Sequence, residues 1–154
     1  MHKYDRVIMI RNVYLIAFSG FILDQLTKFM ARHWLLERSV DAGFFRFDLV
    51  FNTGAAYGLF SDFTSILLWL GWLAIAYILY SLRTLVKHPM EMVAFGCILA
   101  GALGNTVDRL VHGRVTDFIN ILIIPVFNLA DVFLNIGIGF IILHYFLHER
   151  KKSN

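Results

Sequence analysis

The sequence is poor in charge, cysteine and proline. Lys, Arg, Asp and Glu make up 16% of its 154 residues, whereas a soluble domain usually carries about 25%, so the composition indicates a membrane class. The single cysteine, Cys97, excludes an intrachain disulfide and any metal site built on several cysteines. A net charge of only +3, with scattered basic residues, argues against nucleic acid as a partner. Hydrophobic side chains, by contrast, make up 58% of the chain.

Long apolar stretches account for most of this hydrophobic content. A helix needs about 20 mainly apolar residues to span a bilayer. Four stretches qualify, at residues 12–31, 63–82, 90–107 and 129–147. Asp24 and Gln25 interrupt the first, so it is not expected to be a cleavable signal peptide. The sequence therefore predicts a membrane all-α fold, in which residues 1–154 form one integral membrane domain with a bundle of four transmembrane helices.

The distribution of basic residues predicts how these helices are oriented. Eight of the fourteen Lys and Arg residues fall on the side that holds both termini, so we expect the termini in the cytoplasm and the long loop 32–62 outside. Asp24 then lies late in the first helix, Asp108 closes the third and Asp131 opens the fourth. In a bundle of antiparallel helices these three carboxylates would meet at one level, near the outer interface.

Two short segments outside the helices have the pattern of β-strands. Residues Phe44–Phe51 alternate roughly and are rich in aromatic and β-branched side chains, and Val115–Ile123 is similar. We expect them to pair into a small extracytoplasmic, β-rich subdomain that lies on the membrane surface. Aromatic side chains are enriched at the headgroup level. Four of them are candidates to anchor the sheet: Trp34, Phe44, Phe45 and Phe47.

Ionisable residues in apolar surroundings are expensive, so they mark a functional site by default. Asp117 and Asp131 lie on either side of Pro125, which breaks regular structure. If the fold brings the two carboxyls together, one keeps a proton while the other stays charged. Such a pair can hydrolyse a peptide bond by general acid–base catalysis without a metal. In the alternative interpretation, Asp131 only caps the fourth helix and Asp117 is an ordinary loop acid.

Further polar residues accompany these two acids. Asn105, Asp108 and Arg109 lie at helical spacing, where a buried arginine fork could hold the carboxylates in a fixed orientation. The same three residues could instead form a structural polar knot between helices, and the two interpretations are compatible. Asp24 and Lys28 form an i,i+4 pair, which we interpret first as an ordinary interfacial ion pair.

Glycines and histidines suggest turns and packing more than ligands. The segment Asn52–Gly58 reads N-T-G-A-A-Y-G, and its small residues could form a turn that lets backbone approach a bound peptide. Gly101 and Gly104 would let the third helix pack closely against a neighbour. His144 and His148 form the only H-x-x-x-H pair and lack an obvious third ligand, so neither a metal nor another cofactor is expected.

Five short blocks, taken in order, have the pattern of a known family. They are Asp24-Gln-Leu-Thr-Lys28, Asn52-x-Gly54-Ala-Ala, Gly104-Asn105-x-x-Asp108-Arg109, Val115-x-Asp117-Phe-Ile119 and Phe127-Asn128-x-Ala130-Asp131. Each block alone is short, but five in order within 154 residues are very specific. Over essentially the whole chain, the sequence resembles the bacterial lipoprotein signal peptidases, also called signal peptidase II.

The resemblance implies a function and assigns it to residues. Asp117 and Asp131 would be the catalytic dyad of an aspartic endopeptidase. The residues that bind substrate or support the site would be Asp24, Lys28, Asn52, Gly54, Asn105, Asp108, Arg109, Asn128 and Ala130. The substrate would be a prolipoprotein whose lipobox cysteine already carries diacylglycerol, cut just before that cysteine. Globomycin-type cyclic peptides would inhibit the enzyme. It would lie among the lipids of the bacterial cytoplasmic (inner) membrane, with its active site at the outer face.

Two other functions are compatible with acids inside a membrane. A small transporter or proton-conducting protein would use them as a relay, but a relay should cross the membrane, whereas these acids cluster at one predicted end. A non-catalytic assembly subunit would not require two acids placed for acid–base chemistry. Cleavage of a diacylated precursor in detergent would distinguish the three functions.

Overall fold

The computed structural model describes residues 3–54 and 63–152, and it contains four long helices and one small sheet. The helices are α1 (Lys3–Trp34), α2 (Phe63–Leu85), α3 (Pro89–His112) and α4 (Leu129–Lys152). All four are long and apolar enough to cross a membrane, as predicted. Each extends beyond its predicted span, because hydropathy detects only the apolar part of a helix whereas the backbone hydrogen bonds continue into the polar flanks.

Helix α3 is the centre of the bundle and packs against the three other helices. Its start is defined by a capping box between His88 and Glu91, with Pro89 at the first turn, and Gly113 ends it in a left-handed conformation. Gly104 is necessary in its interior, since a Cβ there would lie 2.9 Å from Asp24 Cγ. The predicted close packing of this helix is therefore confirmed.

The sheet has three antiparallel strands in the order β1-β2-β3, namely β1 (Val40–Ala42), β2 (Phe45–Asn52) and β3 (Val115–Asn120). The predicted pairing of the second and third strands is confirmed, with Arg46 opposite Asn120 and Val50 opposite Asp117. Strand β1 was not predicted. Strand β3 is shorter than predicted, because Leu122 adopts a left-handed backbone conformation, with φ of 66°, two residues beyond Asn120.

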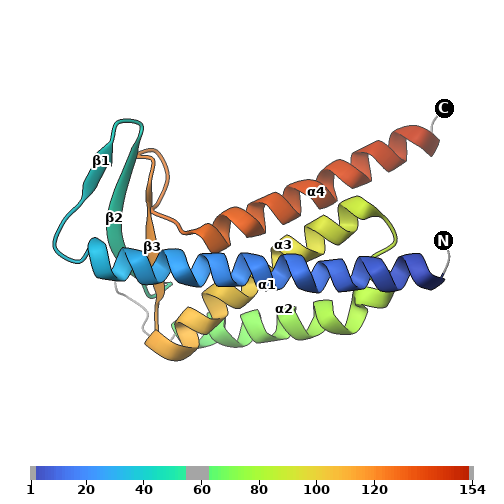
Figure 1. Ribbon diagram of the computed structural model, residues 1–154, viewed down its shortest axis with the longest axis horizontal. Coiled ribbons are helices and arrows are strands. Elements are labelled where there is room, and N and C mark those ends of the chain that lie inside the picture. The colour runs from blue at the N-terminus through green and yellow to red at the C-terminus, as the bar shows by residue number, and fades with distance from the viewer. Residues whose placement is uncertain (1–2, 55–62, 153–154) are drawn as a thin grey trace.

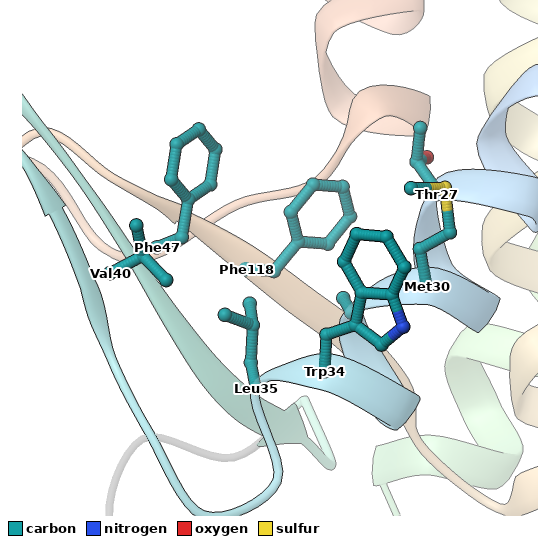
Figure 2. Close-up of a pocket in the computed structure, with 8 residues that line it drawn as sticks. Thr27, Met30, Trp34, Leu35, Val40, Phe47 and Phe118 are labelled. Atoms are coloured by element: carbon teal, nitrogen blue, oxygen red, sulfur yellow. The ribbon is translucent and has the colours of Figure 1, made fainter.

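The sheet and the two chain termini lie at opposite ends of the molecule (Figure 1). This arrangement agrees with helices that run alternately up and down, and it places Asp117 of β3 at the sheet end. The aromatic side chains expected to anchor the sheet fall into two groups. Phe44 and Phe45 are exposed, whereas Phe47 is partly buried and, with Trp34, lines an apolar groove between α1 and the sheet (Figure 2).

Candidate active site

The site begins with a buried ion pair on α1. Lys28 Nζ lies 3.0 Å from Asp24 Oδ2, and both side chains are 0% exposed. The interpretation of this pair as an ordinary interfacial one is therefore wrong, since the neighbouring helices cover it completely. A charge so far from solvent requires several partners. Lys28 finds two more on α3, the side-chain oxygen of Asn105 at 2.9 Å and Asp108 Oδ2 at 3.6 Å.

Asp24 also holds the start of α4 in place. Its Oδ1 accepts a hydrogen bond of 2.8 Å from the backbone N–H of Ala130, in the first turn of that helix. A carboxylate is stabilised there by the unpaired N–H groups and by the helix dipole. Gln25 donates to Asp24 Oδ2 and to the carbonyl of Gly104, which ties α1 to α3 at the same level. The predicted convergence of α1, α3 and α4 is thus observed.

Asp108 connects the helices to the sheet. Its Oδ2 accepts from the backbone N–H of Thr116 in β3 at 2.8 Å, and Arg32 donates both to Asp108 Oδ1 at 3.4 Å and to the Thr116 hydroxyl at 2.8 Å. Asp108 is fully buried. It therefore fixes the strand that carries Asp117 against the helix that carries Asn105.

Two asparagines connect the candidate catalytic acids. Asn105 donates to Asp131 Oδ1 at 2.8 Å, and its oxygen accepts from Lys28 and from Asn128. Asn128 donates to Asp117 Oδ1 at 2.6 Å. Since each amide uses its oxygen and its nitrogen for different partners, neither can rotate without losing bonds. Asp117 and Asp131 thus belong to one hydrogen-bond network.

Asp131 has a structural role as well. Its Oδ2 accepts from the backbone N–H of Asn128, and the Asn128 side chain accepts from the backbone N–H of Asp131, both at 3.1 Å. These reciprocal bonds form a capping box at the start of α4. The interpretation of Asp131 as a helix cap is correct, and it is compatible with a chemical role because Oδ1 faces Asn105.

Asp117 is buried and accepts hydrogen bonds from two amides, those of Asn128 and of Asn52 at 2.9 Å. Burial raises the pKa of this carboxyl to about 6. The negative charge of Asp131 also raises this pKa, whereas the hydrogen bonds from the two amides lower it. The Asn52 oxygen accepts from the backbone N–H of Gly54 at 2.7 Å, which fixes the orientation of its amide. Asp117 is therefore not an ordinary loop acid.

Gly54 is favoured by its backbone conformation, and a larger residue there would also have to displace a side chain. Its φ is 81°, a left-handed conformation, and a Cβ would lie 2.5 Å from Leu67 Cδ1 on α2. The Thr64 hydroxyl, near the start of α2, donates to the carbonyl of Thr53. These contacts hold Asn52 at the end of β2 over the site. The rest of the predicted turn, residues 55–58, lies outside the described residues.

Among the residues that the structure describes, Arg109 forms no fork with the carboxylates, in contrast to the prediction. Arg109 donates weakly to the carbonyl of Asn105 at 3.5 Å, and within the described ranges its buried Nε has no hydrogen-bond partner. It still interacts electrostatically with Asp131, Asp117 and Asp108. Neutral asparagines orient the two carboxyls instead: Asn105 contacts Asp131, and Asn128 contacts Asp117. Amides can bind a carboxyl group in both protonation states, whereas a guanidinium fork favours the charged one.

Sequence reasoning did not identify Arg32 and Thr116 as site residues. Arg32 lies four positions after Lys28, which in turn lies four after Asp24, so a polar stripe along one face of α1 could have indicated it. Thr116 has no such signal, because its partners Arg32 and Asp108 become neighbours only when β3 docks on the bundle.

The opposite end of the bundle carries a separate cluster of histidines. His144 Nε2 lies 3.4 Å from Glu91 Oε1, and its ring lies near those of His88 and His148. Over the part of the chain that the structure describes, no group of three or more His, Cys, Asp or Glu side chains is arranged to hold a metal ion. The expectation that the protein needs no metal remains a prediction.

Comparison with solved structures first defines the class of protein. A chain described as a bacterial membrane enzyme, solved at 2.3 Å, superposes with a TM-score of 0.82 and 31% identity, covering 93% of this chain and 92% of that one. A second chain, solved at 1.9 Å and described in the same way, superposes with a TM-score of 0.81 and is 30% identical. The match covers 88% of this chain and 93% of that one. The fold is therefore that of a bacterial membrane enzyme.

Sequence comparison then identifies the family. The family model for signal peptidase (SPase) II matches residues 16–147. Two relatives are called lipoprotein signal peptidase. The protein from Symbiobacterium thermophilum is 38% identical, and the match covers 90% of this chain and 96% of the relative. The protein from Microcystis aeruginosa is 40% identical, and the match covers 92% of this chain and 96% of the relative. The chain belongs to the signal peptidase (SPase) II family and is a membrane peptidase.

Proposed function

We propose that this peptidase is an aspartic endopeptidase that removes signal peptides from diacylglyceryl-modified prolipoproteins, cutting just before the lipid-bearing cysteine. The observation that carries the aspartic mechanism is the hydrogen-bond network, in which Asn105 and Asn128 join Asp117 to Asp131. The substrate class rests on the relatives, which are called lipoprotein signal peptidases at 38–40% identity in the two cited above.

The charges of the network favour one shared proton. Four carboxyl groups and three basic groups are connected at the sheet end of the bundle: Asp24, Asp108, Asp117, Asp131, Lys28, Arg32 and Arg109. A single retained proton makes this largely buried set neutral, which lowers the cost of burying its fully covered members. Asp117 is the better holder of that proton because its pKa is raised to about 6. Asp131 lies at a helix N-terminus, where negative charge is favoured.

Hydrolysis then follows from one acid and one base. Asp131 takes a proton from water as the water oxygen bonds to the scissile carbonyl carbon, and Asp117 gives its proton to the carbonyl oxygen. In the second step, Asp131 gives its proton to the leaving nitrogen as the C–N bond breaks. Asp117 recovers a proton from the hydroxyl as the carbonyl re-forms. The products are a carboxylic acid and an amine, and both aspartates return to their starting states.

The other site residues support this pair. Asn52 and Gly54 place an amide over Asp117, and Lys28, Asp108 and Arg109 supply the charge environment. Asp24 and Ala130 fix the start of α4. Globomycin-type cyclic peptides would compete with the substrate peptide for this site. Neither metal nor cofactor takes part.

The position of the site suits a substrate that remains in the bilayer. The network joins the helices to β3 through Asp108 and Asn128, and β3 lies at the sheet end of the helices (Figure 1). Near a membrane surface, this end would let a peptide bond and water meet while acyl chains stay in lipid. The bias of basic residues toward the end that holds the termini supports cytoplasmic termini and an active site at the outer face of the inner membrane. A relay across the membrane is not favoured, because these acids gather at one end.

The test is cleavage of a diacylated precursor peptide by the purified protein, followed by mass spectrometry of the products. The same peptide without diacylglycerol is the substrate control, and Asp117→Asn and Asp131→Asn are the enzyme controls. We expect one cut, before the lipid-bearing cysteine, only with the acylated peptide and only with both aspartates. Equal cleavage of the unacylated peptide would contradict the substrate class. Near-normal cleavage by either folded variant would contradict the assigned roles.

A further inference from the structure

One end of the sheet carries a patch of exposed apolar side chains from two loops and from the first residue of β2. Phe44 lies in the β1–β2 turn, Phe45 begins β2, and Leu122, Ile123 and Ile124 belong to the loop after β3. Phe44 and Ile123 are each 84% exposed. The strand register brings the loops together, because Arg46 pairs with Asn120 and both loops begin within two residues of that pair. We call this set of five residues the apolar tip.

The loop after β3 is an ordered turn. The Asn120 side chain accepts from the backbone N–H of Leu122 at 2.8 Å, and Ile123 N–H donates to the carbonyl of Ile121 at 2.9 Å. Leu122 has a φ of 66°, a conformation that leucine rarely adopts. Such conformations cluster at functional sites, and here the conformation accompanies a run of exposed apolar side chains.

Polar groups lie directly behind the apolar tip. Arg46 Nε donates to Asp48 Oδ1 and the Asn120 amide donates to Asp48 Oδ2, both at 2.7 Å, and Arg46 also reaches the Ser39 hydroxyl. This sequence of layers, apolar at the end and then charged and hydrogen-bonded, matches the change from acyl chains to headgroups at a membrane surface.

The tip extends the apolar surface of α1, a helix long and apolar enough to cross a membrane. Met30 and Trp34 are exposed on α1, a helix that can span the membrane. They also line an apolar groove of about 310 Å³ that passes from α1 to Val40 on β1 and Phe47 on β2 (Figure 2). An apolar surface therefore runs from the spanning helix across the sheet toward the tip. Patches of this kind on a protein need a covering partner.

We propose that the apolar tip is immersed in the phospholipid leaflet at the sheet end, at the boundary between headgroups and acyl chains. The partner is lipid, not a protein or a second copy of this chain. The loop after β3 also joins the strand of Asp117 to the helix of Asp131, so its contact with lipid sets the depth of both acids relative to the membrane. The proposal goes beyond the proposed function and does not depend on either acid being catalytic.

Nitroxide accessibility tests the proposal in the whole protein. Single cysteines replace Phe44, Ile123 or the exposed, charged Glu37 in a Cys97→Ala background, and the labelled proteins are reconstituted in vesicles of phosphatidylcholine and phosphatidylglycerol. Oxygen concentrates in lipid, whereas a neutral nickel chelate stays in water. We expect labels at Phe44 and Ile123 to collide several-fold more with oxygen, relative to the chelate, than the label at Glu37.

Each other outcome would overturn the proposal. A ratio at Phe44 and Ile123 equal to that at Glu37 would place the apolar tip in water. Low collision with both reagents, together with spin–spin broadening at full labelling, would show that a second copy covers it. Low collision without broadening would indicate burial against protein. Because the two probes lie on different loops, a folding defect in one variant leaves the other informative.

Discussion

Replacement of Lys28 by methionine should greatly destabilise the protein. The substitution keeps most of the side-chain volume but removes the ammonium group, which contacts Asp24 at 3.0 Å, Asp108 at 3.6 Å and the Asn105 oxygen at 2.9 Å. All three charged side chains are 0% exposed. Breaking a buried pair in this way typically costs about 3–5 kcal/mol, because a charge remains without its partner. At about 2–4 °C per kcal/mol for a chain of this size, the melting temperature should fall by roughly 6–20 °C.

Thermal unfolding in detergent, followed by circular dichroism, measures this loss. Lys87→Met is the matched control, because Lys87 is exposed and the same substitution there should change the free energy of unfolding by about 0.5 kcal/mol or less. Adding Asp24→Asn to Lys28→Met should recover part of the stability, since it removes one unpaired carboxylate. The account of the network would be refuted if Lys28→Met melted at the same temperature as Lys87→Met.

Three further results are expected. Gly54→Ala should reduce stability and activity more than Gly43→Ala. Both glycines have positive φ, but only at Gly54 would an added Cβ collide with Leu67. Equal effects of the two substitutions would contradict a role for that collision. Activity should persist in a metal chelator. If the chelator abolished activity and one divalent ion restored it, the enzyme would depend on a metal. Because the pKa of Asp117 is raised, its ionisation destabilises the fold as pH rises from 3.8 toward 6. The free energy of unfolding of Asp117→Asn, relative to wild type, should therefore rise by up to about 3 kcal/mol between pH 4 and pH 7. A stability difference that is independent of pH would contradict the raised pKa.

The helices and the two longer strands could be predicted because each depends on local pattern. Apolar runs of about 20 residues indicate spans, and alternating aromatic and β-branched residues indicate strands. Strand β1 has only three residues, Val40–Ala42, too few for a periodicity to be recognised. The left-handed conformation of Leu122, which follows β3, had no sequence signal either, because such positions usually carry glycine, asparagine or aspartate.

The sequence indicated which polar residues would lie close together, but not the contacts between them. Helical spacing places Asn105 and Arg109 on one face of α3, but it does not decide which of the two reaches the carboxyls. The structure gives that contact to Asn105, through Asp131 Oδ1. The bond from Asn128 to Asp117 joins a helix cap to a strand, and the bond from Arg32 to Thr116 joins residues that are 84 positions apart. Such pairs depend on how elements dock, which no local pattern encodes.

The pH dependence of kcat/KM for a diacylated precursor tests the shared proton most directly, with the stability of the protein checked at each pH. Protonating both Asp117 and Asp131 removes the base, and ionising both removes the acid. The account therefore predicts a bell-shaped profile whose two apparent pKa values belong to the pair. Its alkaline limb should lie near pH 6, well above the 3.8 of an ordinary aspartate, because Asp117 is buried. A single acidic limb followed by a flat plateau to high pH would contradict the shared proton and assign proton donation to another group.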